Sequence, residues 1–177
     1  MSAIAKILPY YTVEEWERWK DQWELIEGIP FAMSPSPVPK HQIISGNLFS
    51  ILKDALKDCK PCKVYLPIDY KIANDTILQP DILVVCGEIK NKYLDFTPAL
   101  IAEILSPSTA LKDRHYKYNI YEQQGISYYL IIDPENNILE IYALIDGKYQ
   151  LQNTSGPFTF SFNSECIKQL SFSDLFE

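Results

Sequence analysis

The chain has 177 residues, of which 47% are hydrophobic and 22% are charged, and these values predict one globular domain over residues 1–177. No apolar run approaches the roughly 18 to 20 residues that a membrane span requires, so we expect no membrane partner. The net charge of -7 argues against a protein that binds nucleic acid through a broad basic surface, although it is compatible with a local basic or metal-bridged site.

The N-terminus and the cysteines give expectations about location. The first nine residues hold a short apolar patch and one lysine without a convincing cleavage site, so we expect no secretory signal and a cytoplasmic protein. Cys59 and Cys62 form a close pair that is typical of a metal site or a redox motif. Cys86 and Cys166 stand alone and the two histidines lack ligand spacing, so we favour reduced, unpaired thiols over a zinc site.

The first third of the chain predicts a helix, a hairpin and a second helix. Thr12 and Glu15 form a capping-box pattern, and three tryptophans follow at spacings that place them on one face of the first helix. Residues 23–33 alternate around a Glu-Gly turn, which predicts a β-hairpin. Residues 34–39 form a Pro-rich connector, and residues 41–57 carry apolar side chains at helical spacing.

Strands dominate the rest of the chain. We expect strands over residues 63–72, 76–85 and 99–105, then a helix over 111–124 that ends at a glycine. An antiparallel meander follows over residues 128–151. The order predicts an α+β (mixed α/β) fold, in which a mixed β-sheet is flanked by helices and ends in C-terminal antiparallel strands.

Two acidic residues stand in otherwise apolar strands. Asp81 begins one such run and Glu103 interrupts the next. An ionised carboxylate is rarely buried without a partner, so the pair indicates a bound cation, a hydrogen-bonding network or a shifted pKa. Asp113, Lys117 and Tyr121 are spaced four apart in the following helix, so they share one face and could direct Lys117 at the carboxylates.

Two carboxylates and an ammonium group suit one kind of chemistry. Mg²⁺ prefers oxygen ligands, keeps several waters and binds phosphate oxygens, and Mn²⁺ is an alternative. Such a metal acidifies a water and neutralises charge on a phosphate, while the lysine stabilises the transition state. The trio therefore predicts hydrolysis of a phosphodiester.

The pattern of Pro80-Asp81 followed by Glu103 on an apolar strand resembles the PD-(D/E)xK nuclease superfamily. The whole chain is similar to the Uma-type family of proposed endonucleases, which has the restriction-endonuclease-like fold. The matching positions are residues 12–16, 23–28, 33–35, His41, 79–82, 103–109, Asp113, Lys117, Tyr121, Gly125 and 133–134. The resemblance implies a metal-dependent endonuclease that acts on DNA, with Asp81 and Glu103 as catalytic metal ligands.

The chain departs from the superfamily at one position. The usual lysine lies two residues after the second acid, where this chain has Leu105. The resemblance implies that Lys117 replaces it from the next helix. It also implies that Glu24 and His41 line the same site, as an additional metal ligand and as a general acid or phosphate contact.

Structural interpretations remain open for the same residues. Backbone N–H groups could satisfy Asp81, Glu103 and Lys117 could form an ion pair without catalysis, and Glu24 and His41 could lie on the surface. Tyr121 could serve packing. The basic residues of the third helix, which are Lys112, Arg114 and Lys117, could contact DNA phosphates or form a solvated helix face.

Three functions follow from these interpretations. The first is the Mg²⁺-dependent endonuclease. The second is a catalytically inactive nuclease-fold protein that binds nucleic acid or protein, and the third is an enzyme for another phosphate substrate. Exposed strands of the C-terminal meander could support a homodimer.

Overall fold

A six-stranded mixed sheet forms the centre of the computed structural model, which describes residues 8–33 and 37–177. Its strand order is β10-β9-β8-β7-β6-β3, and all neighbours run antiparallel except β7 and β8. The strands are β3 (Cys62–Tyr65), β6 (Ile82–Cys86), β7 (Leu100–Ile104), β8 (Tyr128–Asp133), β9 (Ile138–Ile145) and β10 (Lys148–Leu151). A helical crossover of η1 (Lys112–Lys117) and α3 (Tyr118–Gln123) joins the parallel pair.

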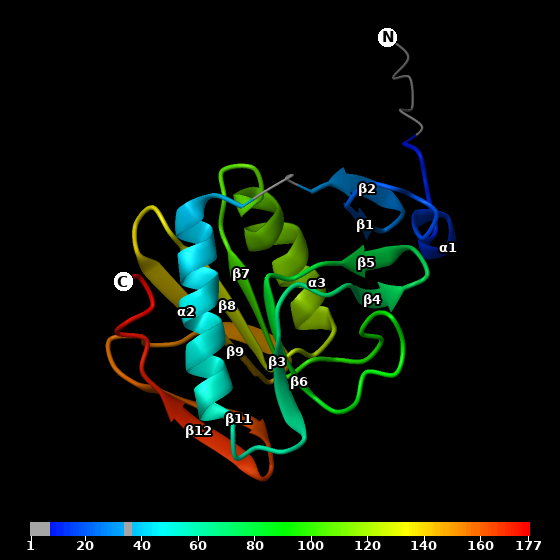
Figure 1. Cartoon of the computed structure of the whole chain (residues 1–177). Helices are drawn as coiled ribbons and strands as arrows, with labels where there is room; N and C mark the ends of the chain where they lie inside the picture. The colour runs from blue at the N-terminus through cyan, green and yellow to red at the C-terminus, as the bar shows by residue number, and fades with distance from the viewer. Residues whose placement is uncertain (1–7, 34–36) are drawn as a thin grey trace.

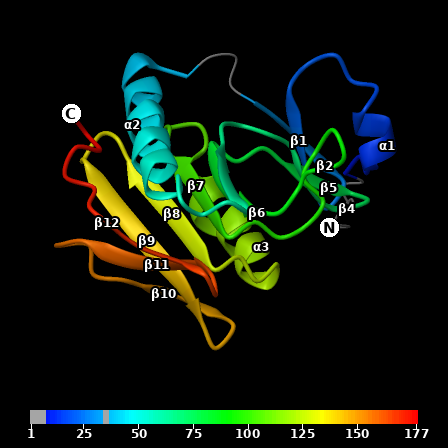
Figure 2. The same ribbon diagram turned by 60° about the horizontal axis from the view of Figure 1, so that its bottom comes forward.

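Helices cover both faces of this sheet (Figures 1 and 2). Helix α2 (Pro39–Ala55) packs on one face, together with a hairpin of β11 (Phe158–Asn163) and β12 (Cys166–Leu170). The crossover with α3 lies on the other face. Side chains alternate along β7, so Ala102 and Ile104 join the core under α2 while Ile101 and Glu103 face the crossover.

A second, four-stranded sheet stands beside the first and has the order β2-β1-β5-β4. Its strands are β1 (Trp23–Ile26), β2 (Ile29–Ala32), β4 (Tyr70–Ala73) and β5 (Thr76–Leu78), and α1 (Val13–Trp16) packs against β1. The predicted capping box of Thr12 and Glu15 and the predicted hairpin turn are confirmed. The chain passes from β5 to β6 through residues 79–81, so Asp81 lies at the junction of the two sheets.

The predicted α+β class is confirmed, as are the mixed sheet, its flanking helices and the C-terminal antiparallel strands. Three local predictions are wrong. The two long strands predicted over residues 63–72 and 76–85 are four short ones, because Pro67 and Pro80 cannot donate to a sheet ladder. The first helix is a single turn, so the third tryptophan, Trp23, lies in β1. The third helix begins as a π-helix, η1.

The prediction of unpaired thiols is also wrong. Disulfides join Cys59 to Cys166, with Cα atoms 5.6 Å apart, and Cys62 to Cys86, with Cα atoms 3.9 Å apart. Cys62 and Cys86 face each other across β3 and β6, and the other bond ties the end of α2 to β12. Spacing along the chain could not show this, because the fold brings together residues 107 positions apart. Closing a loop of that length constrains the unfolded chain by about 4–5 kcal/mol in the entropic model.

Other expectations concern the ends of the chain and its connectors. Residues 1–7, where no secretory signal was expected, and residues 34–36 of the Pro-rich connector lie outside the described residues. None of the helices in the described ranges has the length and apolar character needed to cross a membrane.

Candidate active site

Asp81 and Glu103 lie close to each other in the fold. Asp81 comes directly before β6, and Glu103 lies on the neighbouring strand β7, where Ala102 pairs with Ile82. Asp81 Oδ2 accepts a hydrogen bond of 2.7 Å from the backbone N–H of Ile104, the residue after Glu103. The Asp81 side chain is 23% exposed, so one of the two acids stays in contact with solvent.

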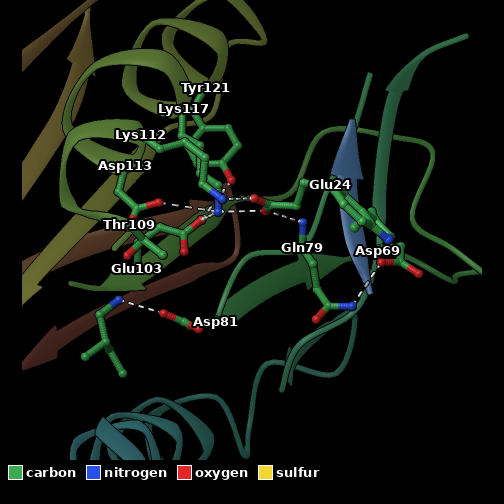
Figure 3. A network of polar contacts seen from close by, with 12 residues as sticks. Glu24, Asp69, Gln79, Asp81, Glu103, Thr109, Lys112, Asp113, Lys117 and Tyr121 are labelled. Atoms are coloured by element: carbon green, nitrogen blue, oxygen red, sulfur yellow. Dashed lines mark hydrogen bonds and ion pairs between the residues drawn. The ribbon is translucent and has the colours of Figure 1, made fainter. Parts of the chain in front are cut away.

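Glu103 is buried against the crossover helix. Its Oε1 accepts hydrogen bonds from Lys117 Nζ at 2.8 Å and from the Tyr121 hydroxyl at 2.9 Å (Figure 3). Both carboxylate and ammonium are only 4% exposed, so Lys117 is not a solvated helix lysine and Tyr121 does more than pack. The third helix therefore directs Lys117 at Glu103.

Glu24 reaches the same lysine from the second sheet. Its side chain is 1% exposed, which excludes the interpretation of an exposed hairpin residue. Glu24 Oε1 lies 2.8 Å from Lys117 Nζ and accepts the backbone N–H of Gln79 at 2.9 Å, while Oε2 contacts Lys112 Nζ. Lys117 thus joins acids from both sheets (Figure 3).

The other residues of the third helix divide into two groups. Asp113 is buried, and its Oδ1 lies 3.5 Å from Lys117 Nζ without a hydrogen bond from any described residue. Arg114 turns away and forms a two-pronged ion pair with Glu140 at 2.9 and 3.0 Å. The three basic residues of this helix therefore do not form one solvated or phosphate-binding face.

His41 lies in the first turn of α2, and its side chain is 16% exposed, so it is not a fully solvated surface histidine. Its Nε2 is 3.3 Å from Asp81 Oδ2. Burial alone would lower the pKa of His41, but the Asp81 carboxylate raises it above its usual value. His41 is thereby placed next to Asp81, whereas Glu24 contacts the opposite end of the cluster.

Sequence reasoning assigned no role to Gln79 and Asp69. The side chain of Gln79 donates to Asp69 Oδ1 at 3.0 Å while its backbone N–H holds Glu24. Burial raises the pKa of Asp69. The signal available in the sequence was a polar residue directly before Pro80 in an apolar stretch, but its partner lies ten residues earlier and becomes visible only in the fold.

Burial and charge act in opposite directions on the buried groups. Burial raises the pKa of Glu103 well above its usual range, Lys117 opposes this, and the neighbouring carboxylates of Asp113 and Asp81 reinforce it. Burial alone would lower the pKa of Lys117, but the surrounding acids raise it well above its usual value. Lys117 is therefore held in its charged form, whereas burial and the neighbouring acids make Glu103 harder to ionise than an exposed glutamate.

This excess of negative charge suits a divalent cation. The cluster contains four carboxyl groups and two ammonium groups, so it carries two net negative charges when all four acids are ionised and the histidine is neutral. Its members are Glu24, Asp81, Glu103, Asp113, Lys112 and Lys117. No set of three or more His, Cys, Asp or Glu residues in the described parts of the chain is arranged to hold a metal. Mg²⁺ needs fewer protein ligands, because it binds one or two carboxylates and keeps water or phosphate at its other positions. The hard oxygen donors of Asp81 and Glu103 fit that requirement.

Known proteins resemble this chain in sequence and in fold. The "Uncharacterized protein slr1290" of Synechocystis sp. (strain ATCC 27184 / PCC 6803 / Kazusa) is 27% identical over 142 residues, which are 77% of this chain and 74% of that protein. A crystal structure from Anabaena variabilis ATCC 29413, described as a "putative nuclease belonging to DUF820", superposes with a TM-score of 0.76 and 23% identity. The match covers 94% of this chain and 97% of that one, and it shows a shared fold.

A family model covers nearly the whole chain as well. The Uma2 model, described as "Putative restriction endonuclease", matches residues 10–173. This range includes every residue of the charge cluster, and it confirms the resemblance of the whole chain to the Uma-type family. The chain therefore belongs to the Uma2 family of proteins described as "Putative restriction endonuclease".

Proposed function

We propose that this protein is a divalent-metal-dependent endonuclease that hydrolyses phosphodiester bonds of DNA, with Asp81 and Glu103 as the ligands of Mg²⁺ or Mn²⁺. One observation carries the proposal. Asp81 directly precedes β6, Glu103 lies on the neighbouring strand β7, and Lys117 Nζ stands 2.8 Å from Glu103 in a cluster whose carboxyl groups outnumber its ammonium groups. Membership of the Uma2 family and the likeness to the Anabaena variabilis protein support a nuclease in general.

The residues of the chain divide the work of such a site. A bound Mg²⁺ would acidify a water and neutralise charge on the scissile phosphate. Lys117 favours the ionised form of Glu103 through its 2.8 Å contact, which opposes the rise in the pKa of Glu103 that burial causes, and it adds a fixed positive charge beside the reacting group. The Ile104 N–H and His41 hold the Asp81 carboxylate in place, and Tyr121 does the same for Glu103.

The net charge of the chain determines what DNA binding would require of the site. A protein of net charge -7 repels a polyanion over most of its surface. A divalent ion held by Asp81 and Glu103 would supply positive charge for the phosphate of the substrate. The metal would then be necessary for productive binding as well as for chemistry.

A second function is favoured by one observation. Each of the contacts of Lys117 is to a carboxylate of the chain itself, which is also the arrangement of a structural ion-pair network. A catalytically inactive descendant with that network would bind nucleic acid or protein without cleaving. It would have no need of a metal at Asp81.

Calorimetric titration with Mg²⁺ and with Mn²⁺ separates the two functions. The nuclease predicts binding of one ion per chain that is lost in Asp81→Ala. A matched control is Asp146→Asn, because Asp146 lies in an exposed turn before Gly147 with a positive φ of 51° that asparagine also adopts. Wild-type protein that binds neither ion, or Asp81→Ala that binds as tightly as wild type, would contradict the metal site.

A further inference from the structure

Two lysines approach one carboxylate in the site, namely Lys112 at the start of η1 and Lys117 at its end (Figure 3). Lys117 Nζ lies 2.8 Å from Glu24 Oε1, and Lys112 Nζ contacts Glu24 Oε2. In an α-helix, side chains five residues apart point roughly 140° away from each other. The wider π-helical turn, whose hydrogen bonds join residues five apart, brings both ammonium groups to the same side.

Lys117 is enclosed by carboxylates of the chain. An ammonium group has three N–H donors. Lys117 Nζ lies 2.8 Å from Glu24 and 2.8 Å from Glu103, and Asp113 Oδ1 lies 3.5 Å away without a hydrogen bond between the two. With a side chain that is 4% exposed, Lys117 acts on a substrate through its charge and not through a direct contact.

Lys112 is placed differently. Among the described residues, its ammonium group contacts a single carboxylate, that of Glu24. Lys112 Nζ also lies 5.9 Å from the centre of the Phe31 ring, within the range of a cation–π interaction. Phe31 faces Glu24 across β1 and β2, so ring and carboxylate form one cradle. The side chain is 13% exposed, and two N–H donors remain beyond the bond to Glu24.

We propose that Lys112 is the residue that donates hydrogen bonds to a phosphate oxygen of the nucleic acid, and that Glu24 is the positioning residue that holds both lysines. The inference rests on the proposed nuclease function and adds the residue that contacts the phosphate. A lysine ammonium is a common phosphate partner. Glu24 and Phe31 already restrict the Lys112 side chain before the substrate binds. Lys112 therefore loses less side-chain entropy on binding a phosphate than a freely moving lysine would.

The salt dependence of DNA binding tests this role, because each lysine–phosphate contact adds about 0.9 to the slope of log K against log salt for duplex DNA. Fluorescence anisotropy of a labelled duplex oligonucleotide, with Ca²⁺ and separately with EDTA, gives that slope. We expect it to fall by about 0.9 in Lys112→Met and to be retained in Lys112→Arg, which keeps the charge. A purely structural role would change thermal stability but not the slope.

Lys148→Met is the matched control. Lys148 also pairs with a glutamate, at 2.8 Å from Glu122, but on β10 outside the charge cluster, so its slope should equal that of wild type. If Lys112→Met does not fold, Lys112→Gln replaces it, because a glutamine amide can still donate to Glu24. We expect the slope to fall by about 0.9 in Lys112→Gln as well. An unchanged slope in a folded Lys112 variant, with wild type binding DNA, overturns the inference and leaves the nuclease intact. Wild type that binds no DNA in either condition overturns both.

Discussion

The charge cluster depends on a residue that belongs to neither of the strands carrying the two candidate ligands. Glu24 comes from β1, yet it contacts both lysines of η1 and the backbone of Gln79, which leads into Asp81. A buried carboxylate with three such partners is satisfied, whereas its removal leaves the ammonium group of Lys112 without its carboxylate partner and that of Lys117 with one acid fewer. Glu24 is therefore the link between the second sheet and the site.

Replacing Glu24 should make stability depend less on pH. Burial raises the pKa of Glu24, but Lys117 and Lys112 outweigh burial and hold it below the usual value of 4.5. An acid whose pKa is lowered by folding stabilises the fold above its unfolded pKa, and this contribution is lost as the pH falls through the folded value. We expect Glu24→Gln to lower the free energy of unfolding by about 3 kcal/mol near pH 7, and by less below about pH 4.5. Urea unfolding over this range measures the difference.

Glu14→Gln supplies the comparison. Glu14 pairs with Arg18 at 2.9 Å on the surface, where it is 81% exposed, so its loss should cost at most about 0.5 kcal/mol. If the loss in free energy of unfolding caused by Glu24→Gln is the same at neutral and acidic pH, Lys112 and Lys117 do not lower the pKa of Glu24, which would contradict the explanation.

The C-terminal end of α3 is fixed by local backbone hydrogen bonds. Helix α3 ends in a Schellman motif, in which Ile126 N–H bonds the Tyr121 carbonyl and Gly125 N–H bonds that of Glu122. Gly125 has a φ of +72°, which L side chains adopt at a cost. This end fixes the position of Tyr121 and, through it, of Glu103.

Two glycines should therefore respond to alanine in opposite ways. Neither Gly46 nor Gly125 has an atom within 4 Å of an added Cβ, so only the backbone differs. Gly125→Ala should destabilise the protein by about 1–2 kcal/mol because of its positive φ. Gly46→Ala, within α2, should stabilise it by about 0.5–1 kcal/mol. Thermal unfolding of the two variants shows whether each change raises or lowers stability relative to wild type. A change in the same direction in both variants would contradict the explanation.

Elements with local signals could be predicted from the sequence. The capping box at Thr12, the glycine after Glu27 and the glycine at position 125 each specify a turn or a helix end without reference to the rest of the chain. The π-helix could not be predicted, because it arises where Lys112 and Lys117 must both reach Glu24. The hairpin of β11 and β12 was missed as well, and it is stabilised by packing on α2 and by a distant disulfide.

The site could be predicted from the sequence where charged residues interrupt apolar segments. Asp81 and Glu103 stood out because they interrupt apolar strands, and helical spacing identified Lys117. The position of Glu24 depends on contacts that span 88 residues to Lys112 and 55 residues to Gln79. Such contacts follow from the arrangement of the two sheets, which no local pattern specifies.

At the scale of the whole molecule, two sheets and the crossover helix each supply one part of the cluster. The six-stranded sheet provides Glu103, the second sheet provides Glu24, the crossover provides the lysines, and Asp81 lies where the sheets join. An acidic molecule with a concentrated negative site gains most from a divalent cation there. A homodimer through the meander stays a prediction; β10 is an edge strand.

Cleavage of duplex DNA tests the central claim most directly. Wild type and Asp81→Asn are incubated with DNA in Mg²⁺ and in EDTA, and the products are resolved on a gel, with Asp146→Asn as the control in an exposed turn. We predict cleavage by wild type and by the control in Mg²⁺ only, and a rate in Asp81→Asn that is at least about a hundredfold lower. Cleavage that persists in EDTA, or full activity in Asp81→Asn, would contradict the account.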